Sequence, residues 1–204
     1  MDAYENIMTR RSVRYYTDEP ISDEVLEKIL RAGMAGPSCT NARDWSFLVT
    51  RDPAVLNKMA DGNGGPAAPL RRAALGIMVL GDLERAFKPA PDYWVIDGAI
   101  AAQNMILAAH ALGVGSVWLG TWPQMERVNK QIAAFELPDT VIPHSIIAFG
   151  YPDQEEEAKP HEPERPKDMP PHGPEGEKPM MPPPPKGPVI KGAFEPERIH
   201  YDQW

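Results

Sequence analysis

Three arginines and a serine lie within five positions near the amino end of the chain, at Arg10, Arg11, Ser12 and Arg14. Arginine presents a planar fork of N–H donors that matches phosphate oxygens, and a serine hydroxyl adds a further donor. In a chain with a net charge of −8, this local concentration of positive charge indicates a site for an anionic ligand. The alternative is a solvated charge run at a helix end, where cations also suit the helix dipole.

A second candidate site is a run of small residues that precedes Trp45 and an apolar stretch of strand length. The run consists of Pro37, Ser38, Cys39, Thr40 and Asn41. Its hydroxyl, amide and backbone groups could hold a flat heterocycle, but an ordinary turn, in which such side chains satisfy their own backbone, is an equally good interpretation. Cys39 could be a nucleophile, yet no histidine is adjacent in the sequence to activate it. A small buried filler is the preferred interpretation of this cysteine.

Size and composition restrict the class of protein. The 204 residues suffice for one domain with a sizeable core, and the acidic net charge argues against a nucleic-acid partner. The first residues lack the basic and apolar regions of a secretory signal, and no apolar run reaches the roughly 20 residues that a bilayer span needs. A single cysteine, Cys39, excludes an internal disulfide and a cysteine-based metal cluster. We therefore expect a cytoplasmic protein without a metal site and without a membrane or nucleic-acid partner.

Proline marks the domain organisation. Half of the 24 prolines fall between Pro160 and Pro188, among glutamate, lysine and glycine. Such a composition buries too little apolar surface to offset chain entropy. We therefore predict a core over residues 1–152, a Pro-rich insertion or linker over residues 153–188, and a docked C-terminal tail over residues 189–204.

Helices and strands are interspersed along the predicted core. Capping residues predict helices after Asp2, Ser22 and Asp52, and further helices are expected over 97–112 and 123–135. Apolar runs predict strands over 46–50, 73–80, 115–121 and 141–149. The Gly- and Pro-rich residues 62–66 are expected to form a loop, and His110 and His144 are interpreted as structural. This order favours an α+β or α/β sheet covered by helices.

These motifs, taken in order, resemble the nitroreductase family of FMN-dependent oxidoreductases. The arginine cluster after the first helix is similar to that family's phosphate-binding opening, and Pro37-Ser38 with Asn41 and Trp45 is similar to its second motif. The segment from Asp97 to Gly120 resembles the central helix and the strand that contacts the flavin. Residues 148–152 and 199–204 resemble the closing turn and the C-terminal tail. The chain departs from the family where Arg43-Asp44 replaces a Gln-Pro pair and where the Pro-rich insertion precedes the tail.

The resemblance implies an α+β fold with a central mixed, mainly antiparallel sheet flanked by helices, and a tail that reaches a partner subunit. It also implies a homodimer with FMN at the interface, which takes hydride from NADH or NADPH at the flavin N5 atom. The hydride then passes to a nitroaromatic, quinone or similar small acceptor by a ping-pong mechanism. No side chain is required as a catalytic acid or base, because the cofactor carries the chemistry.

The same resemblance assigns roles to the candidate residues. Arg10 and Ser12, helped by Arg11, would bind the FMN phosphate. Arg14 would lie near the N1/O2 edge of the flavin ring, where a positive charge stabilises the reduced form. The segment from Pro37 to Asn41 would come from the partner subunit. Four further positions complete the set. Trp118 lies in the strand that would contact the flavin, backbone groups of Leu119 and Gly120 would meet the N5 side, and Lys191 is the best match to a basic residue that meets the phosphate.

Two other functions remain open from the sequence. One is a flavin-fragmenting or reductive-dehalogenating relative on the same fold. The other is a non-catalytic flavin-binding or adaptor protein whose Pro-rich segment docks on aromatic grooves of a partner. Steady consumption of NAD(P)H with a quinone or nitroaromatic acceptor separates turnover from binding alone, and a pull-down with the Pro-rich segment deleted tests the adaptor.

Overall fold

The computed structural model describes residues 1–159 of the chain. Four antiparallel strands form its sheet in the order β1-β2-β4-β3. They are β1 (Trp45–Thr50), β2 (Leu75–Asp82), β3 (Gly115–Gly120) and β4 (Val141–Gly150). Among the described residues, one parallel bridge joins this sheet to the N-terminal segment, between Ser12 and Ser116. The sheet is therefore mainly antiparallel, as predicted.

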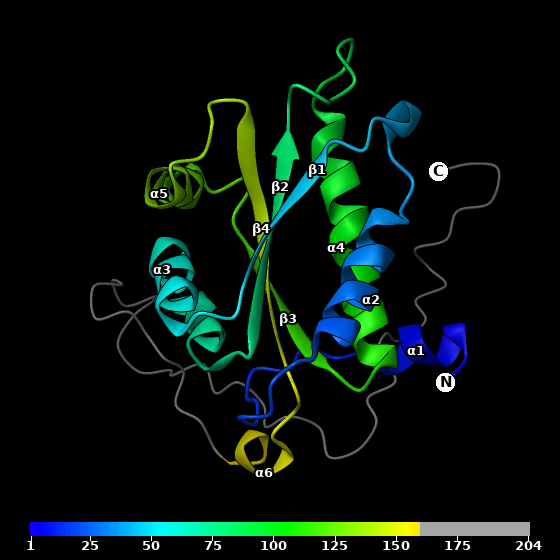
Figure 1. Ribbon diagram of the computed structural model, residues 1–204, viewed down its shortest axis with the longest axis vertical. Coiled ribbons are helices and arrows are strands. Elements are labelled where there is room, and N and C mark those ends of the chain that lie inside the picture. Colours follow the sequence, from blue (N-terminus) through cyan, green and yellow to red (C-terminus); the bar gives the residue numbers. More distant parts are fainter. Residues whose placement is uncertain (160–204) are drawn as a thin grey trace, which may run out of the picture.

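Helices cover both faces of the sheet (Figure 1). One face carries α2 (Asp23–Met34) and the long α4 (Tyr93–Ala111). The other carries α3 (Pro53–Asn63), the 3-10 helix η2 (Gly65–Arg72) and α5 (Met125–Phe135). This arrangement of helices around an antiparallel sheet confirms the α+β fold class.

Side-chain caps set the first helices as the sequence predicts. The Asp2 carboxylate accepts the N–H of Glu5 at 2.8 Å and begins α1 (Ala3–Thr9). Ser22 accepts the N–H of Val25 at 3.2 Å at the start of α2, and Asp52 caps α3 in the same way. Each cap satisfies an N–H that the helix itself leaves without a partner.

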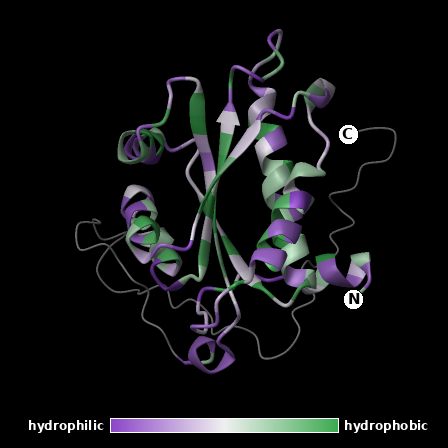
Figure 2. Cartoon of the chain, in the orientation of Figure 1, coloured by the Kyte–Doolittle hydropathy of each residue, from purple (hydrophilic) through white to green (hydrophobic). Residues whose placement is uncertain are grey.

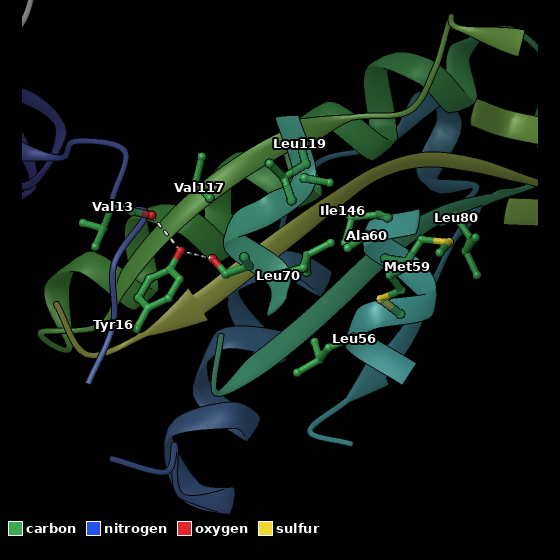
Figure 3. Packing of buried hydrophobic residues seen from close by; sticks show 13 residues of the cluster. Val13, Tyr16, Leu56, Met59, Ala60, Leu70, Leu80, Val117, Leu119 and Ile146 are labelled. Atoms are coloured by element: carbon green, nitrogen blue, oxygen red, sulfur yellow. Dashed lines mark hydrogen bonds between the residues drawn. The ribbon is translucent and has the colours of Figure 1, made fainter. Parts of the chain in front are cut away.

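Two apolar clusters fill the space between sheet and helices. β2 is buried from Leu75 to Gly81, because neighbouring strands flank it on both sides and helices cover both its faces. In Figure 2 the middle of the sheet is largely hydrophobic, whereas α6 (Gln154–Glu157) is hydrophilic. Figure 3 shows Tyr16 closing one cluster, where its hydroxyl donates to the carbonyls of Val13 and Ala148 at 2.6 and 3.3 Å. The segment after the arginine cluster is thus part of the core.

Two elements differ from the sequence prediction. Helix α4 begins at Tyr93 rather than at Asp97, so Asp97 lies inside the helix, where its side chain accepts the N–H of Cys39 from another segment. Residues Gly62 and Asn63 close α3 instead of forming a loop, and η2 follows directly. A Cβ at Gly62 would lie 2.4 Å from Nε2 of Gln131, so α3 and α5 pack in close contact here. That tertiary contact holds a glycine inside a helix that its propensity would end.

The structure describes seven residues beyond the predicted end of the core at residue 152, and they include helix α6. The N–H of Asp153 donates to the carbonyl of Tyr15 at 3.1 Å, and the Asp153 carboxylate caps α6. The start of the predicted insertion therefore packs on the N-terminal segment. The rest of the insertion, the predicted tail and Lys191 lie outside the described residues. Within residues 1–159, no helix has both the length and the hydropathy that crossing a membrane requires.

Candidate functional site

Backbone pairing fixes the arginine cluster against the edge of the sheet. The N–H of Val13 donates to the carbonyl of Ser116 in β3 at 2.9 Å, and Tyr16 pairs with Pro152. The close approach depends on Gly115, since a Cβ there would lie 2.8 Å from the Val13 side chain. The residues from Arg10 to Arg14 therefore occupy a defined position beside β3.

A pocket of about 250 Å³ lies beneath this cluster. Its walls come from the N-terminal segment, the turn between α4 and β3, and the start of α6; they include Arg10, Arg11, His110, Gly113, Ser116 and Gln154. Arg10 is partly buried here and has no carboxylate partner within residues 1–159. Burial lowers the pKa of the Arg10 guanidinium, which stays protonated because arginine titrates far above neutral pH. A partly desolvated, unpaired cation is what an anion site requires.

His110, which the sequence analysis interprets as structural, is half-buried and contributes to the wall of this pocket. The ring Nε2 lies 3.0 Å from the hydroxyl of Thr9, which itself donates to the carbonyl of Glu5. Burial and the nearby Arg10 and Arg11 lower the pKa of His110. Because the Thr9 hydroxyl donates to Glu5, the tautomer with its proton on Nε2 suits the contact between the ring and this hydroxyl.

Arg11 has a partner inside the chain. Its guanidinium lies 2.5 Å from the carboxylate of Glu157 in α6, and the other oxygen of that carboxylate accepts the N–H of Arg14 at 3.3 Å. The Arg14 side chain itself is exposed. The cluster therefore divides into one unpaired arginine at the pocket, one compensated arginine and one arginine that faces solvent.

The second predicted segment is a strained, braced loop that contains the short helix η1 (Cys39–Asn41). Three of its non-glycine residues have positive φ: Thr40 at 50°, Asn41 at 59° and Arg43 at 50°. Such conformations cost of the order of 1 kcal/mol or more each, and a β-branched threonine adopts them rarely. The Ser38 hydroxyl accepts the N–H of Arg43 at 3.0 Å and helps to hold the loop, while the side chains of Thr40 and Asn41 are exposed. The fold therefore holds this loop in a strained conformation, with the side chains of Thr40 and Asn41 at the surface of the molecule.

A buried pair of carboxyl side chains, which no sequence pattern indicated, lies behind that loop. The Asp97 carboxylate accepts the N–H of Cys39, and Asp44 lies beside it with 1 % of its surface exposed. Burial, and secondly the Asp97 charge, raise the pKa of Asp44 to about 6. Within residues 1–159, neither buried Asp44 oxygen meets a hydrogen-bond donor at normal geometry. A buried carboxyl without such a donor is disfavoured in its charged form, which agrees with the raised pKa.

At the end of β3, the space next to Gly120 is open, and the side chains before it pack against other parts of the protein. Leu119 is buried in the core, and the Trp118 ring packs edge-on against His144 with their centroids 5.7 Å apart. A Cβ at Gly120 would meet nothing within 4 Å. The Gly120 carbonyl accepts a hydrogen bond from Nη1 of Arg127 at 2.8 Å and another from Nδ2 of Asn63 at 3.2 Å. Neither donor was a candidate from the sequence, because Asn63 was placed in a loop and Arg127 in an ordinary surface helix.

The two predicted halves of the site lie apart in one chain. The arginine cluster sits near the start of α2, whereas η1 follows its end, and Figure 1 shows them at opposite ends of this helix. A helix of 12 residues is about 18 Å long. A single chain therefore brings Arg10 and Ser12 close to β3 but leaves the loop from Pro37 to Asn41 at a distance.

Comparison with known proteins agrees with this geometry. The sequence model of the Nitroreductase family matches residues 7–79 and 63–151. A Methanothermobacter thermautotrophicus protein, provisionally named NADH dehydrogenase/NAD(P)H nitroreductase, is 34% identical over 204 residues, which cover 100% of this chain and 88% of the relative.

Solved structures show the same fold. A similarly named Parabacteroides distasonis protein superimposes with a TM-score of 0.76 at 30% identity, over 98% of each chain. A provisionally named nitroreductase from Desulfovibrio desulfuricans, solved in complex with FMN, gives a TM-score of 0.64 at 35% identity, over 76% of this chain and 88% of that one. The antiparallel sheet, the cationic segment against β3 and the length of these matches lead to one conclusion: the chain belongs to the nitroreductase family.

Proposed function

We propose that this protein is an FMN-dependent oxidoreductase that transfers hydride from NADH or NADPH to a nitroaromatic, quinone or similar small acceptor. The observation that carries the proposal is the Arg10 guanidinium, which lines a pocket beside Ser12 without a carboxylate partner in the described chain. The family relationship and the FMN found in the Desulfovibrio desulfuricans relative support it.

The residues present fit the cofactor's two ends. Arg10 lines the pocket and offers charge-assisted donors of the kind that bind a phosphate, and Ser12, two residues further along the chain, would add its hydroxyl. At the other end of β3, the open space in front of Gly120 leaves room for a flat ring to approach the backbone. Arg14 is exposed and free to approach the N1/O2 edge of the ring, where its charge stabilises the reduced form.

A second copy of the chain completes the proposed site. The strained loop with Thr40 and Asn41 is too far from the arginine cluster to act within one chain, so it would contribute to the partner's site. An exposed apolar surface on α4 offers the contact area, with Ile96 53% exposed beside Val95, Ala99 and Ile100. Self-complementary apolar surfaces of this kind are typical of symmetric dimers.

When bound, FMN supplies the hydride chemistry: it accepts hydride from the nicotinamide and passes it to the acceptor in a second half-reaction, which gives ping-pong kinetics. The chain's own groups bind the phosphate, orient the ring and keep the two half-reactions in one pocket. No described side chain is needed as an acid or base for these tasks, so none is assigned a catalytic role.

The decisive measurement is the flavin content of the purified protein. We expect about one FMN per chain, released on denaturation, a dimer in sedimentation, and steady NAD(P)H oxidation with a quinone or nitroaromatic acceptor. A colourless monomer that takes up no added FMN would contradict the proposal. Flavin binding without NAD(P)H consumption would instead favour the non-catalytic alternative.

The C-terminal part of the proposal stays a prediction, because Lys191 and residues 189–204 lie outside the described chain. Lys191 would add a cation at the phosphate, and the tail would clasp the partner subunit. Truncation after Pro188 should then weaken the dimer and lower the flavin content. Unchanged sedimentation with full flavin content would refute the clasp.

A further inference from the structure

The carbonyl of Gly120 is held by two side chains that come from different helices. Asn63 ends α3 and Arg127 lies in the first part of α5, yet both donate to this one oxygen, at 3.2 and 2.8 Å. A carbonyl oxygen has two lone pairs, so the two donors saturate it. The peptide at the end of β3 is therefore fixed in orientation.

A buried network stands behind this contact. The Oδ1 of Asn63 accepts from the Thr121 hydroxyl at 3.0 Å and from Nε2 of Gln131 at 3.2 Å, and Gln131 also donates to the carbonyl of Met59. Asn63, Thr121 and Gln131 are almost entirely buried. Buried polar groups of this kind cost free energy unless they are paired, and both polar atoms of the Asn63 side chain are paired here, although Oε1 of Gln131 has no partner among the described residues. The Asn63 amide is thus locked in the orientation that donates to Gly120.

The orientation of the carbonyl also fixes that of the Gly120 N–H. In an antiparallel strand, both backbone groups of a residue point to the same side, and the side alternates from residue to residue. In β3 the Ser116 carbonyl points away from β4, toward Val13, and the Thr121 N–H points toward β4, to the carbonyl of His144. By this alternation the N–H of Gly120 points away from β4, to the open edge of the sheet. Under the proposed function, the N5 edge of the flavin would lie at this edge of the sheet and would accept a hydrogen bond there.

We propose that Asn63 and Arg127 are positioning residues that clamp the Gly120 peptide, so that its N–H faces the N5 edge of a bound flavin. This inference rests on the proposed function and deepens it. The two side chains occupy the carbonyl oxygen, and they leave the N–H, which points to the same edge of the sheet, as the backbone group of Gly120 still available there. A glycine is required there because a side chain would fill the space that the ring occupies.

The clamp has two separable consequences. It fixes the distance between the flavin and the backbone, and small displacements of a reacting centre reduce rates by large factors. It also places the positive charge of Arg127 near the reacting edge, and a nearby positive charge favours the reduced flavin. The phosphate contacts at Arg10 lie at the other end of β3, so the affinity for FMN should depend little on the clamp.

The test compares two substitutions on the same helix. Arg127→Met removes one donor of the clamp and its charge, while Lys130→Met removes an exposed lysine that pairs with Glu126 at the surface. We expect Arg127→Met to bind FMN within about threefold of the wild type, because the phosphate contacts remain. Its bound flavin should have a more negative midpoint potential, and its rate of flavin reduction by NAD(P)H should fall about tenfold or more. Lys130→Met should match the wild type in all three measurements.

The conservative variant distinguishes positioning from a merely structural role. Arg127→Lys keeps a charged donor and should recover most of the potential and of the rate. An unchanged potential and rate in Arg127→Met, with wild-type protein that binds FMN, would overturn the clamp while leaving the proposed function intact. A large loss of FMN affinity in Arg127→Met would also overturn it. A wild-type protein that binds no FMN would instead overturn the proposed function.

Discussion

Both carboxylate oxygens of Asp97 accept the backbone N–H of Cys39, at distances of 3.1 and 3.0 Å. The contact joins the second turn of α4 to η1, 58 residues earlier in the chain. It holds the strained loop through a buried side chain of α4, in addition to the Ser38 hydroxyl of the loop itself. The loop's geometry is therefore set from α4.

Replacement of Asp97 with alanine should release this loop. The Cys39 N–H would lose its acceptor in a partly buried position, which costs about 1–3 kcal/mol of stability. Under the proposed function, the affinity for FMN should fall as well, because the loop serves the partner's site. Urea unfolding and a fluorescence titration with FMN measure the two effects. Asp92→Ala is the matched control, since the Asp92 side chain precedes the same helix without capping it; equal effects in both variants would contradict the anchoring role.

The buried Asp44 predicts a pH dependence of stability. Its pKa is about 6 in the folded protein, against about 3.9 for an unperturbed aspartate. Between these values the folded state binds more protons than the unfolded state, so this group makes the unfolding free energy fall as pH rises. Its stabilising contribution is complete below about pH 4 and is lost above about pH 6.

Asp44→Asn isolates this effect, because an amide stays uncharged at every pH. The difference in unfolding free energy between variant and wild type should move in the variant's favour from pH 4 to pH 7. Urea unfolding at four pH values across this range provides the measurement, and the paired difference cancels the titration of all groups that the two proteins share. A difference that does not change with pH would show that Asp44 is not the group that titrates.

Arg10→Ala tests the phosphate contact. Loss of a charge-assisted hydrogen bond costs about 1.5–3 kcal/mol, so the FMN dissociation constant should rise about ten- to a hundredfold. Stability should change little, because this side chain has no partner within residues 1–159. Arg31→Ala in α2 is the control, since its exposed i,i+4 pair with Glu27 contributes only tenths of a kcal/mol. Tight FMN binding by Arg10→Ala would move the phosphate site elsewhere.

Glu157→Gln tests whether the Glu157 carboxylate in α6 partly compensates the positive charge of the arginine cluster. The carboxylate compensates Arg11, so its removal leaves one more uncompensated positive charge beside the proposed phosphate site. We expect FMN to bind about two- to tenfold more tightly at low salt, with the gain reduced at high salt by screening. Glu155→Gln changes the net charge equally on the same helix but touches no arginine, so its effect should be small. Weaker binding by Glu157→Gln would instead show that the Arg11–Glu157 pair supports the site.

Local signals predicted those parts of the fold that depend on neighbouring residues. The caps at Asp2, Ser22 and Asp52 act within three residues, so the starts of α1, α2 and α3 followed from the sequence. The arginine cluster was visible for the same reason. The contact of the Asp97 carboxylate with η1 could not be predicted, since no sequence rule shows which distant N–H a carboxylate will meet. Gly62 and Asn63 were taken for a loop because their contacts with α5 and β3 are tertiary.

The sequence by itself determined the fold class, the family resemblance and the cationic segment, because periodicity, capping and charge density are properties of short stretches. Only the tertiary structure decided which groups meet: Arg11 is paired with Glu157, Arg10 lines a pocket without a carboxylate partner among residues 1–159, and the Gly120 carbonyl accepts hydrogen bonds from Asn63 and Arg127. The physical reason is that hydrogen bonds and ion pairs act over about 3 Å, between groups that only the folded backbone brings together.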